Sequence, residues 1–185
     1  MRVRRMWGIA MFVTLLLAVP TCSSDSAELD ELKGERDALA AELAAIEIRR
    51  DLTTANQQLI AAIIADPEAY GDEEEALDAM TALAQPGAVM DDTAFGAVPI
   101  RSAWRNTIFG LDAKITTWAT WLAEDGSSGG SLWTWSGKAR NGEPFNLIGI
   151  NIDSYDDDGL VSYSLVDWPY PGEVVRTAVA SGGPD

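Results

Sequence analysis

The stretch NIDSYDDDGLVSYSLVDW, residues 151–168, places three aspartates and a glycine between two apolar runs. Such a cluster belongs either to a calcium loop or to a sharp turn between strands. An EF-hand loop with Gly159 as its sixth residue would begin at Ser154 and end at Leu165, which offers no side-chain oxygen for the closing position. Alternating runs rather than helical patterns flank the cluster. The stretch is therefore predicted to be a hairpin whose turn contains Asp158-Gly159.

The same alternation continues upstream to Ile115. The dipeptides Asp125-Gly126 and Asn141-Gly142 interrupt it, and dipeptides of this kind between alternating runs are typical of β-hairpins. Residues 115–168 are therefore predicted to form a meander of four antiparallel strands.

Helical patterns precede this meander. One helix is predicted from Ala27 to about Asp66, because a residue that precedes proline disfavours the helical conformation. A second carries apolar residues at helical spacing, and a third begins near Ile100 after a short strand. A last short helix is predicted over Gly172–Ala180, and residues 181–185 are predicted to fray. The apolar positions of the second helix are Ala76, Leu77, Met80, Leu83 and Ala84.

Residues 22–51 contain a heptad-like series of leucines and an isoleucine, separated by charged residues. This pattern indicates either a stalk with a short coiled coil or an amphipathic helix that lies on its own domain. Both interpretations remain open at this point. The series is Leu29, Leu32, Leu39, Leu43 and Ile46.

The first residues resemble an export signal. Three arginines within the first five positions precede an apolar run from Met6 to Val19, which is shorter than the 20 or so residues of a membrane span. The single cysteine, Cys22, follows this run and is followed by a polar stretch. The arrangement resembles a bacterial lipoprotein box, with residues 1–21 as the signal peptide and Cys22 as the lipidated N-terminus. The expected location is therefore the outside of the cell membrane, through the lipid anchor, and ordinary secretion is the alternative.

The charge and composition exclude several classes of function. The formal net charge is −16, and such a field repels nucleic-acid phosphates, so no nucleic-acid partner is expected. The chain contains no histidine, which excludes catalytic triads and metal sites that need imidazole. No metal site and no cofactor are expected.

Three segments carry a resemblance to a known family. They are LIAAIIADPEAYGDEEEALDAMTALAQPGAVMDD, GGSLWTWSGKARNGEPFNLIGINI and YDDDGLVSYSLVDW. Over residues 52–180 the chain is similar to the nuclear transport factor 2-like superfamily, and within it to SnoaL-like and ketosteroid-isomerase-like domains. The resemblance implies an α+β fold in which N-terminal helices pack into a cone of curved antiparallel sheet and leave an apolar pocket.

The resemblance also implies where catalytic residues would lie. Asp92 occupies the place of the general base of isomerases with this fold, although a loop aspartate that caps the following residues is the alternative. The oxyanion hole of those isomerases needs a tyrosine and a protonated aspartate. The corresponding positions here are Leu59 and about Asn151, and leucine cannot donate a hydrogen bond. Steroid-isomerase chemistry is therefore not favoured.

Several further residues are candidates for the pocket. Trp133 and Trp135 are two apart on one predicted strand and share a face, so they form either an aromatic pocket wall or part of the core. Trp104 and Phe109 are expected to close the cone from the helix side. Asp167, at a strand end, is either a pocket residue or an acceptor for backbone amides.

Three functions are consistent with these features. The first is an exported, lipid-anchored module that binds a small apolar ligand or a protein partner. The second is a SnoaL-like isomerase, cyclase or dehydratase that uses Asp92 as the base. The third is a structural module that forms a homodimer. The leader and the incomplete oxyanion hole favour the first.

Overall fold

The computed structural model describes residues 26–109 and 113–182, so the predicted signal peptide and Cys22 lie outside the described residues. The chain divides into two compact units, Met1–Glu42 and Leu43–Asp185, which are treated separately below. The helices are α2 (Ser26–Ala65), α3 (Glu73–Thr81), α4 (Ile100–Trp104) and α5 (Gly172–Ser181), with a 3₁₀ turn η1 (Pro67–Tyr70) and a π turn η2 (Arg105–Phe109). The strands are β1 (Ala84–Asp92), β2 (Gly96–Pro99), β3 (Lys114–Leu122), β4 (Ser128–Lys138), β5 (Pro144–Tyr155) and β6 (Val161–Asp167).

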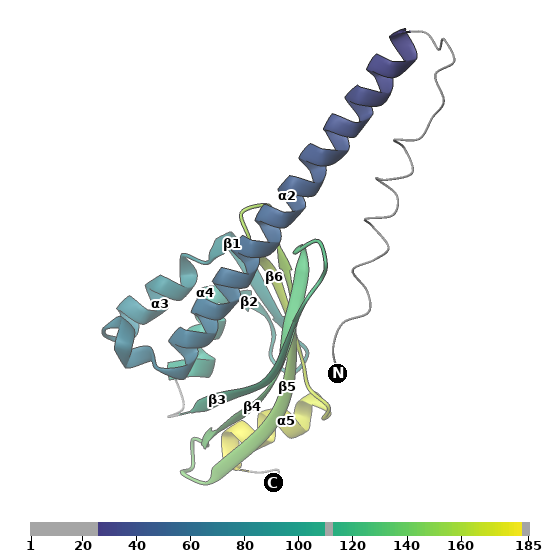
Figure 1. Ribbon diagram of the computed structural model, residues 1–185. Coiled ribbons are helices and arrows are strands. Elements are labelled where there is room, and N and C mark those ends of the chain that lie inside the picture. Colours follow the sequence, from purple (N-terminus) through teal and green to yellow (C-terminus); the bar gives the residue numbers. More distant parts are fainter. Residues whose placement is uncertain (1–25, 110–112, 183–185) are drawn as a thin grey trace, which may run out of the picture. The chain divides into compact units, whose positions relative to one another are not determined.

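The six strands form one curved sheet in the order β2-β1-β6-β5-β4-β3 (Figure 1). The predicted meander from β3 to β6 is present, with antiparallel pairing throughout. The prediction of a wholly antiparallel sheet is wrong, because β1 pairs in parallel with β6. Hairpin signals describe only strands that follow each other in the sequence. β1 and β6 are neighbours in the sheet but are far apart in the sequence.

The start of β1 also differs from the prediction. The helical pattern ends at Thr81, and the segment predicted to continue the helix to Ala84 instead begins the strand. The register against β6 shifts between Ala84 and Val89, which is the interval that contains Pro86 and Gly87. Proline and glycine inside a strand commonly mark such an irregularity. Pro86 and Gly87 therefore lie within β1, at its register shift, and do not simply follow the end of a helix.

Two hairpin turns hold the second half of α2 against the sheet. Gly126 and Gly159 both adopt a φ of 73°, in the left-handed region that favours glycine. A Cβ atom on Gly126 would come within 2.7 Å of the Arg50 Cα, and one on Gly159 would come within 2.6 Å of the Thr53 nitrogen. The Thr53 hydroxyl donates to the Gly126 carbonyl at 3.1 Å, and the Asn56 amide donates to the Gly159 carbonyl at 2.9 Å. The acidic turn that contains Gly159 therefore packs against α2.

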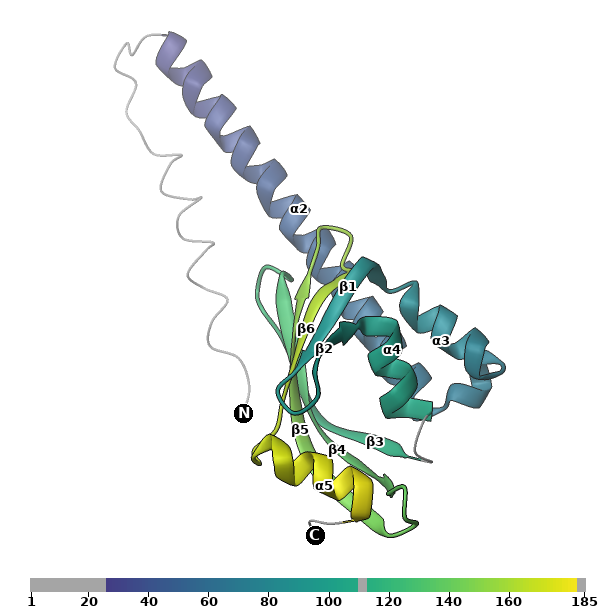
Figure 2. The ribbon, with the colours of Figure 1, turned by 180° about the vertical axis from the view of Figure 1, so that it is seen from behind.

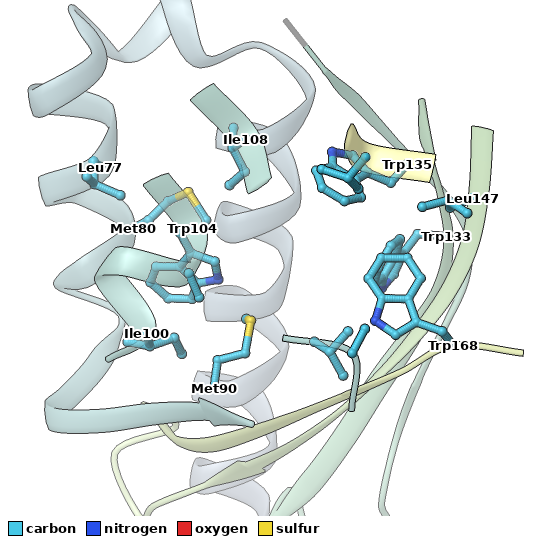
Figure 3. Packing of buried hydrophobic residues seen from close by; sticks show 14 of the residues in the cluster. Leu77, Met80, Met90, Ile100, Trp104, Ile108, Trp133, Trp135, Leu147 and Trp168 are labelled. Carbon is cyan, nitrogen blue, oxygen red and sulfur yellow. The ribbon is translucent and has the colours of Figure 1, made fainter. Parts of the chain in front are cut away.

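The core lies between the inner face of the sheet and the helices α2, α3 and α4 (Figure 2). Ile63 of α2 and Leu77 and Met80 of α3 are fully buried. α5 packs through Val175, which is also fully buried. Figure 3 shows how the buried side chains of the helices face those of the sheet. The predicted α+β class, with helices packed on a curved sheet, is confirmed.

The leucines of the first unit lie on the surface of α2. Leu29, Leu32 and Leu39 are each about half exposed. The coiled-coil stalk therefore stays a prediction. Within the described part of the chain, no helix combines the length and the apolar character that a membrane crossing needs.

Candidate functional site

A partly enclosed cavity of about 110 Å³ lies inside the second unit, between the inner face of the sheet and the helices. Its wall is mainly apolar and aromatic, and it also includes polar side chains from the strands and from η2. The apolar and aromatic lining comprises Ile60, Ile64, Met90, Trp104, Ile108, Ile115, Trp133, Trp135, Val166 and Trp168. The polar lining comprises Asp92, Thr107, Thr117, Ser131, Asn151, Asp153 and Ser164. A few well-placed polar groups in an apolar cavity are typical of small-molecule sites.

The register of β4, β5 and β6 assembles the polar group. Asn151 lies opposite Ser131, and Asp153 lies opposite Ser164. The Asn151 side-chain oxygen accepts hydrogen bonds from the Ser131 hydroxyl and, at 3.0 Å, from the Trp133 indole. Its amide nitrogen donates to the Asp153 carboxylate. Because Asn151 and Asp153 are two residues apart, both point to the same face of β5.

Asp153 connects this group to the helix layer. The Tyr155 hydroxyl donates to the Asp153 carboxylate at 3.3 Å and accepts from the Gln57 amide of α2 at 2.9 Å. Burial raises the pKa of Asp153 from its ordinary value to about 6, against the opposing hydrogen bonds from Ser164, Tyr155 and Asn151. Burial and the neighbouring Asp153 charge raise the pKa of Tyr155 as well, so that tyrosine stays neutral. The cavity therefore contains a carboxyl group that titrates near neutral pH.

Asp92 lines the same cavity from the end of β1 and is 7% exposed. One of its oxygens, Oδ1, accepts three hydrogen bonds: from the backbone nitrogens of Ala94 at 2.7 Å and Phe95 at 3.1 Å, and from the Trp168 indole at 2.9 Å. These are the bonds of a side chain that caps the loop after it. Among the described residues, Oδ2 has no hydrogen-bond partner. Asp92 therefore secures the β1–β2 loop with one oxygen and leaves the other available.

The tryptophans on the sheet side have fixed orientations. The Trp135 indole donates to the Thr107 carbonyl at 2.9 Å, while Trp133 and Trp168 donate to Asn151 and Asp92. Trp133 and Trp168 pack edge to face with ring centroids 5.1 Å apart. The Trp133 ring also lies against Gly149, where any Cβ atom would overlap it. In Figure 3, these three rings lie across from Trp104 of α4 and Ile108 of η2.

The structure brings five of the residues proposed from the sequence into the cavity wall, and three lie elsewhere. Asp92, Trp104, Trp133, Trp135 and Asn151 line the cavity.

The three that lie elsewhere have other surroundings. Leu59 is 38% exposed, and its neighbour Ile60 faces the cavity instead. Phe109 lines a separate depression beside Pro67. Asp167 is exposed and accepts a hydrogen bond from the Thr93 hydroxyl at 2.9 Å.

Sequence reasoning missed Asp153, Trp168 and the helix residues Ile60 and Ile64. A signal for Asp153 was present, because it shares the strand face of Asn151. Trp168 comes directly after β6, which ends at Asp167. Outside a strand, the alternation of side chains does not predict which way a residue points. Within residues 26–109 and 113–182, no group of His, Cys, Asp and Glu side chains is arranged to hold a metal ion.

No protein-family model matches the sequence, and no curated protein matches it. Solved structures do match. A protein of unknown function with a cystatin-like fold from Methylobium petroleophilum PM1 is 19% identical, with a TM-score of 0.51 over 66% of this chain and 78% of the other. A Mycobacterium tuberculosis protein solved in complex with estradiol-17beta-hemisuccinate is 9% identical, with a TM-score of 0.51 over 63% of this chain and 93% of the other.

The likeness is one of fold. A Δ5-3-ketosteroid isomerase from Mycobacterium sp. also matches, at 15% identity and a TM-score of 0.49 over 63% of this chain and 92% of that one. The two matches with a TM-score of 0.51 show a likeness of fold. At these identities, the activity of a neighbour does not transfer to this chain.

Proposed function

We propose that this chain is an exported, lipid-anchored protein whose sheet domain binds a small, mainly apolar molecule in the cavity described above. The observation that carries the proposal is the cavity itself: its lining is mainly aromatic and aliphatic, and a hydrogen-bonded group of polar side chains on β4 and β5 forms part of it. The leader sequence that ends at Cys22 supports export and anchoring.

The cavity limits the size of the ligand. An apolar cavity of about 150 Å³ accommodates benzene, so a volume of about 110 Å³ suits a molecule of a few non-hydrogen atoms or one portion of a larger molecule. A steroid would require the surrounding tryptophans to move. The proposal is therefore for a small ligand.

The enzymatic alternative with Asp92 as the base receives less support. The three hydrogen bonds to Asp92 Oδ1 hold the side chain against its own loop and against Trp168. The position corresponding to the isomerase tyrosine, Leu59, is exposed outside the cavity. A binding function needs neither group to act as a catalyst.

Ligand entry provides a direct test. Thr117 lines the cavity and is exposed, so it lies where the cavity meets solvent. Thr117→Trp is expected to block the cavity and weaken the binding of benzene at least about tenfold, which corresponds to about 1.4 kcal/mol. Saturation-transfer NMR with benzene as the probe measures this. The matched control is Ala119→Trp. Ala119 pairs with Leu132, and the side chains of Leu132 and Trp133 point to opposite faces of the sheet. The new tryptophan at position 119 would therefore lie on the face away from Trp133 and the cavity.

Equal loss of benzene binding in both tryptophan variants would contradict the assignment of this cavity. Unchanged binding in both would place the benzene site elsewhere. Wild-type protein that binds neither benzene nor a smaller organic probe, such as isopropanol or trimethylammonium, would count against the proposed function as a whole.

The anchor is tested separately from the cavity. Cys22→Ser is expected to move the protein from the detergent phase to the aqueous phase in a cloud-point partition of cell membranes. The mature mass of the wild-type chain should correspond to cleavage before Cys22 with added acyl groups. A wild-type protein that partitions with water and carries no acyl mass would contradict lipid anchoring while leaving the cavity proposal intact.

A further inference from the structure

The charges that line the cavity are all of one sign. Among its described lining residues, Asp92 and Asp153 are acidic, and none is basic. Asp92 keeps one oxygen without a partner among the described residues, while the other is held by three donors. The whole chain carries a formal net charge of −16, which adds a long-range field of the same sign. An anionic ligand would meet only repulsion here.

Most of the hydrogen-bond donors in the polar lining are already used within the protein. Ser131 donates to Asn151, Asn151 donates to Asp153, and Tyr155 donates to Asp153. The indole nitrogens of Trp133, Trp135 and Trp168 are likewise engaged in the wall. The acceptors are therefore in excess, which favours a ligand that donates hydrogen bonds or carries positive charge.

The tryptophan rings add a second preference in the same direction. Because their N–H groups bond within the wall, the surfaces that remain for a ligand are ring carbons and their π-systems. Cations bind to the faces of tryptophan more strongly than to those of other aromatic side chains, and the gain is largest where water is excluded. The indole of Trp168 donates to the Asp92 carboxylate, which increases the electron density of that ring. Three fixed rings and Trp104 surround one small volume.

We infer that the cavity takes a small organic cation, namely an alkyl- or methylammonium group, with its alkyl part against the tryptophans and its charge toward Asp92 and Asp153. This inference rests on the proposed function, since it names the ligand class of the same cavity. Two carboxylates and the faces of the rings offset the cost of removing the cation's charge from water, and burial of its methyl groups against the rings is itself favourable. The volume of about 110 Å³ admits a head group of this size.

Trimethylammonium chloride and isopropanol provide a matched pair of probes, because each has four non-hydrogen atoms and only the first is charged. Isothermal titration at pH 7.5 and low salt is expected to give at least tenfold tighter binding for trimethylammonium. Asp153→Asn removes the charge with little change in shape and is expected to weaken trimethylammonium binding about tenfold. The control is Asp158→Asn, which removes the same charge from an exposed turn residue outside the cavity.

Thr117→Trp keeps the test decisive if the Asp153 variant does not fold, because it should abolish trimethylammonium binding without removing a charge. Isopropanol or benzene binding as tightly as trimethylammonium would overturn the inference and leave the proposed function standing. Equal weakening by Asp153→Asn and Asp158→Asn would also overturn it, since the effect would then come from the net charge alone. If none of the three probes binds, both the inference and the proposed function fail.

Discussion

Gly159→Ala is expected to lower the free energy of unfolding by about 3 kcal/mol. An alanine in the left-handed conformation costs about 1–2 kcal/mol, and overpacking against neighbouring atoms costs a further 1–3 kcal/mol. The new Cβ would lie 2.6 Å from the backbone nitrogen of Thr53, so α2 itself would have to shift. Such a shift also strains the hydrogen bond from Asn56 to the Gly159 carbonyl. Urea unfolding of the wild type and the variant, followed by circular dichroism, measures the change.

Gly142→Ala is the matched control for this experiment. Gly142 lies in another hairpin turn with a φ of 89°, but a Cβ atom there would meet nothing within 4 Å. Only the conformational cost of about 1–2 kcal/mol is expected. If the two alanine variants lose the same stability, the turn at Gly159 does not pack against α2 as described.

Asp153 is expected to make the protein more stable as the pH falls. Its pKa is about 6 in the folded state and 3.8 in the absence of perturbation, so the folded state binds the proton more tightly than the unfolded state. The resulting stabilisation is fully present below the unfolded pKa and is lost as the pH rises through the folded pKa. At 1.36 kcal/mol per pKa unit, the full contribution is about 3 kcal/mol, of which about 2 kcal/mol is present at pH 4.5.

The other carboxylates also titrate in this range, so the test compares variants. Asp153→Asn should lose about 2 kcal/mol of the difference in unfolding free energy between pH 4.5 and pH 7.5. Asp158→Asn, in an exposed turn, should keep the wild-type difference. An Asp153→Asn protein with the wild-type pH dependence would show that Asp153 titrates at its ordinary pKa in the folded state.

Local patterns in the sequence predicted the hairpins well. Asp125-Gly126, Asn141-Gly142 and Asp158-Gly159 each mark a real turn, and the glycine of each has a positive φ. Such signals depend only on neighbouring residues. The parallel pairing of β1 with β6 depends on packing between segments more than 60 residues apart, and no dipeptide encodes it.

The site was predictable to the extent that period-two alternation governs it. Trp133 and Trp135 share a strand face through this alternation, and both line the cavity. Asn151, which also lines it, was proposed from the family resemblance. Leu59 lies on a helix, where a shift of one residue rotates the side chain by about 100°. The neighbouring Ile60 faces the cavity for that reason. The place of Asp153 beside Asn151 could have been predicted from the same alternation. Its raised pKa could not, because that depends on burial, which only the three-dimensional structure defines.

The contact between Trp133 and Gly149 limits how this cavity can evolve. The ring occupies the space that any larger side chain at position 149 would need, and the two residues lie directly opposite each other in the register. A larger residue at 149 is tolerable only after Trp133 has been replaced by a smaller one. Replacement of Trp133 by a smaller residue alone would enlarge the cavity. A smaller residue at 133 together with a larger one at 149 would form this part of the wall from β5 instead of β4. Positions 133 and 149 are therefore expected to change together, and such a paired change would alter the cavity volume without a change of fold.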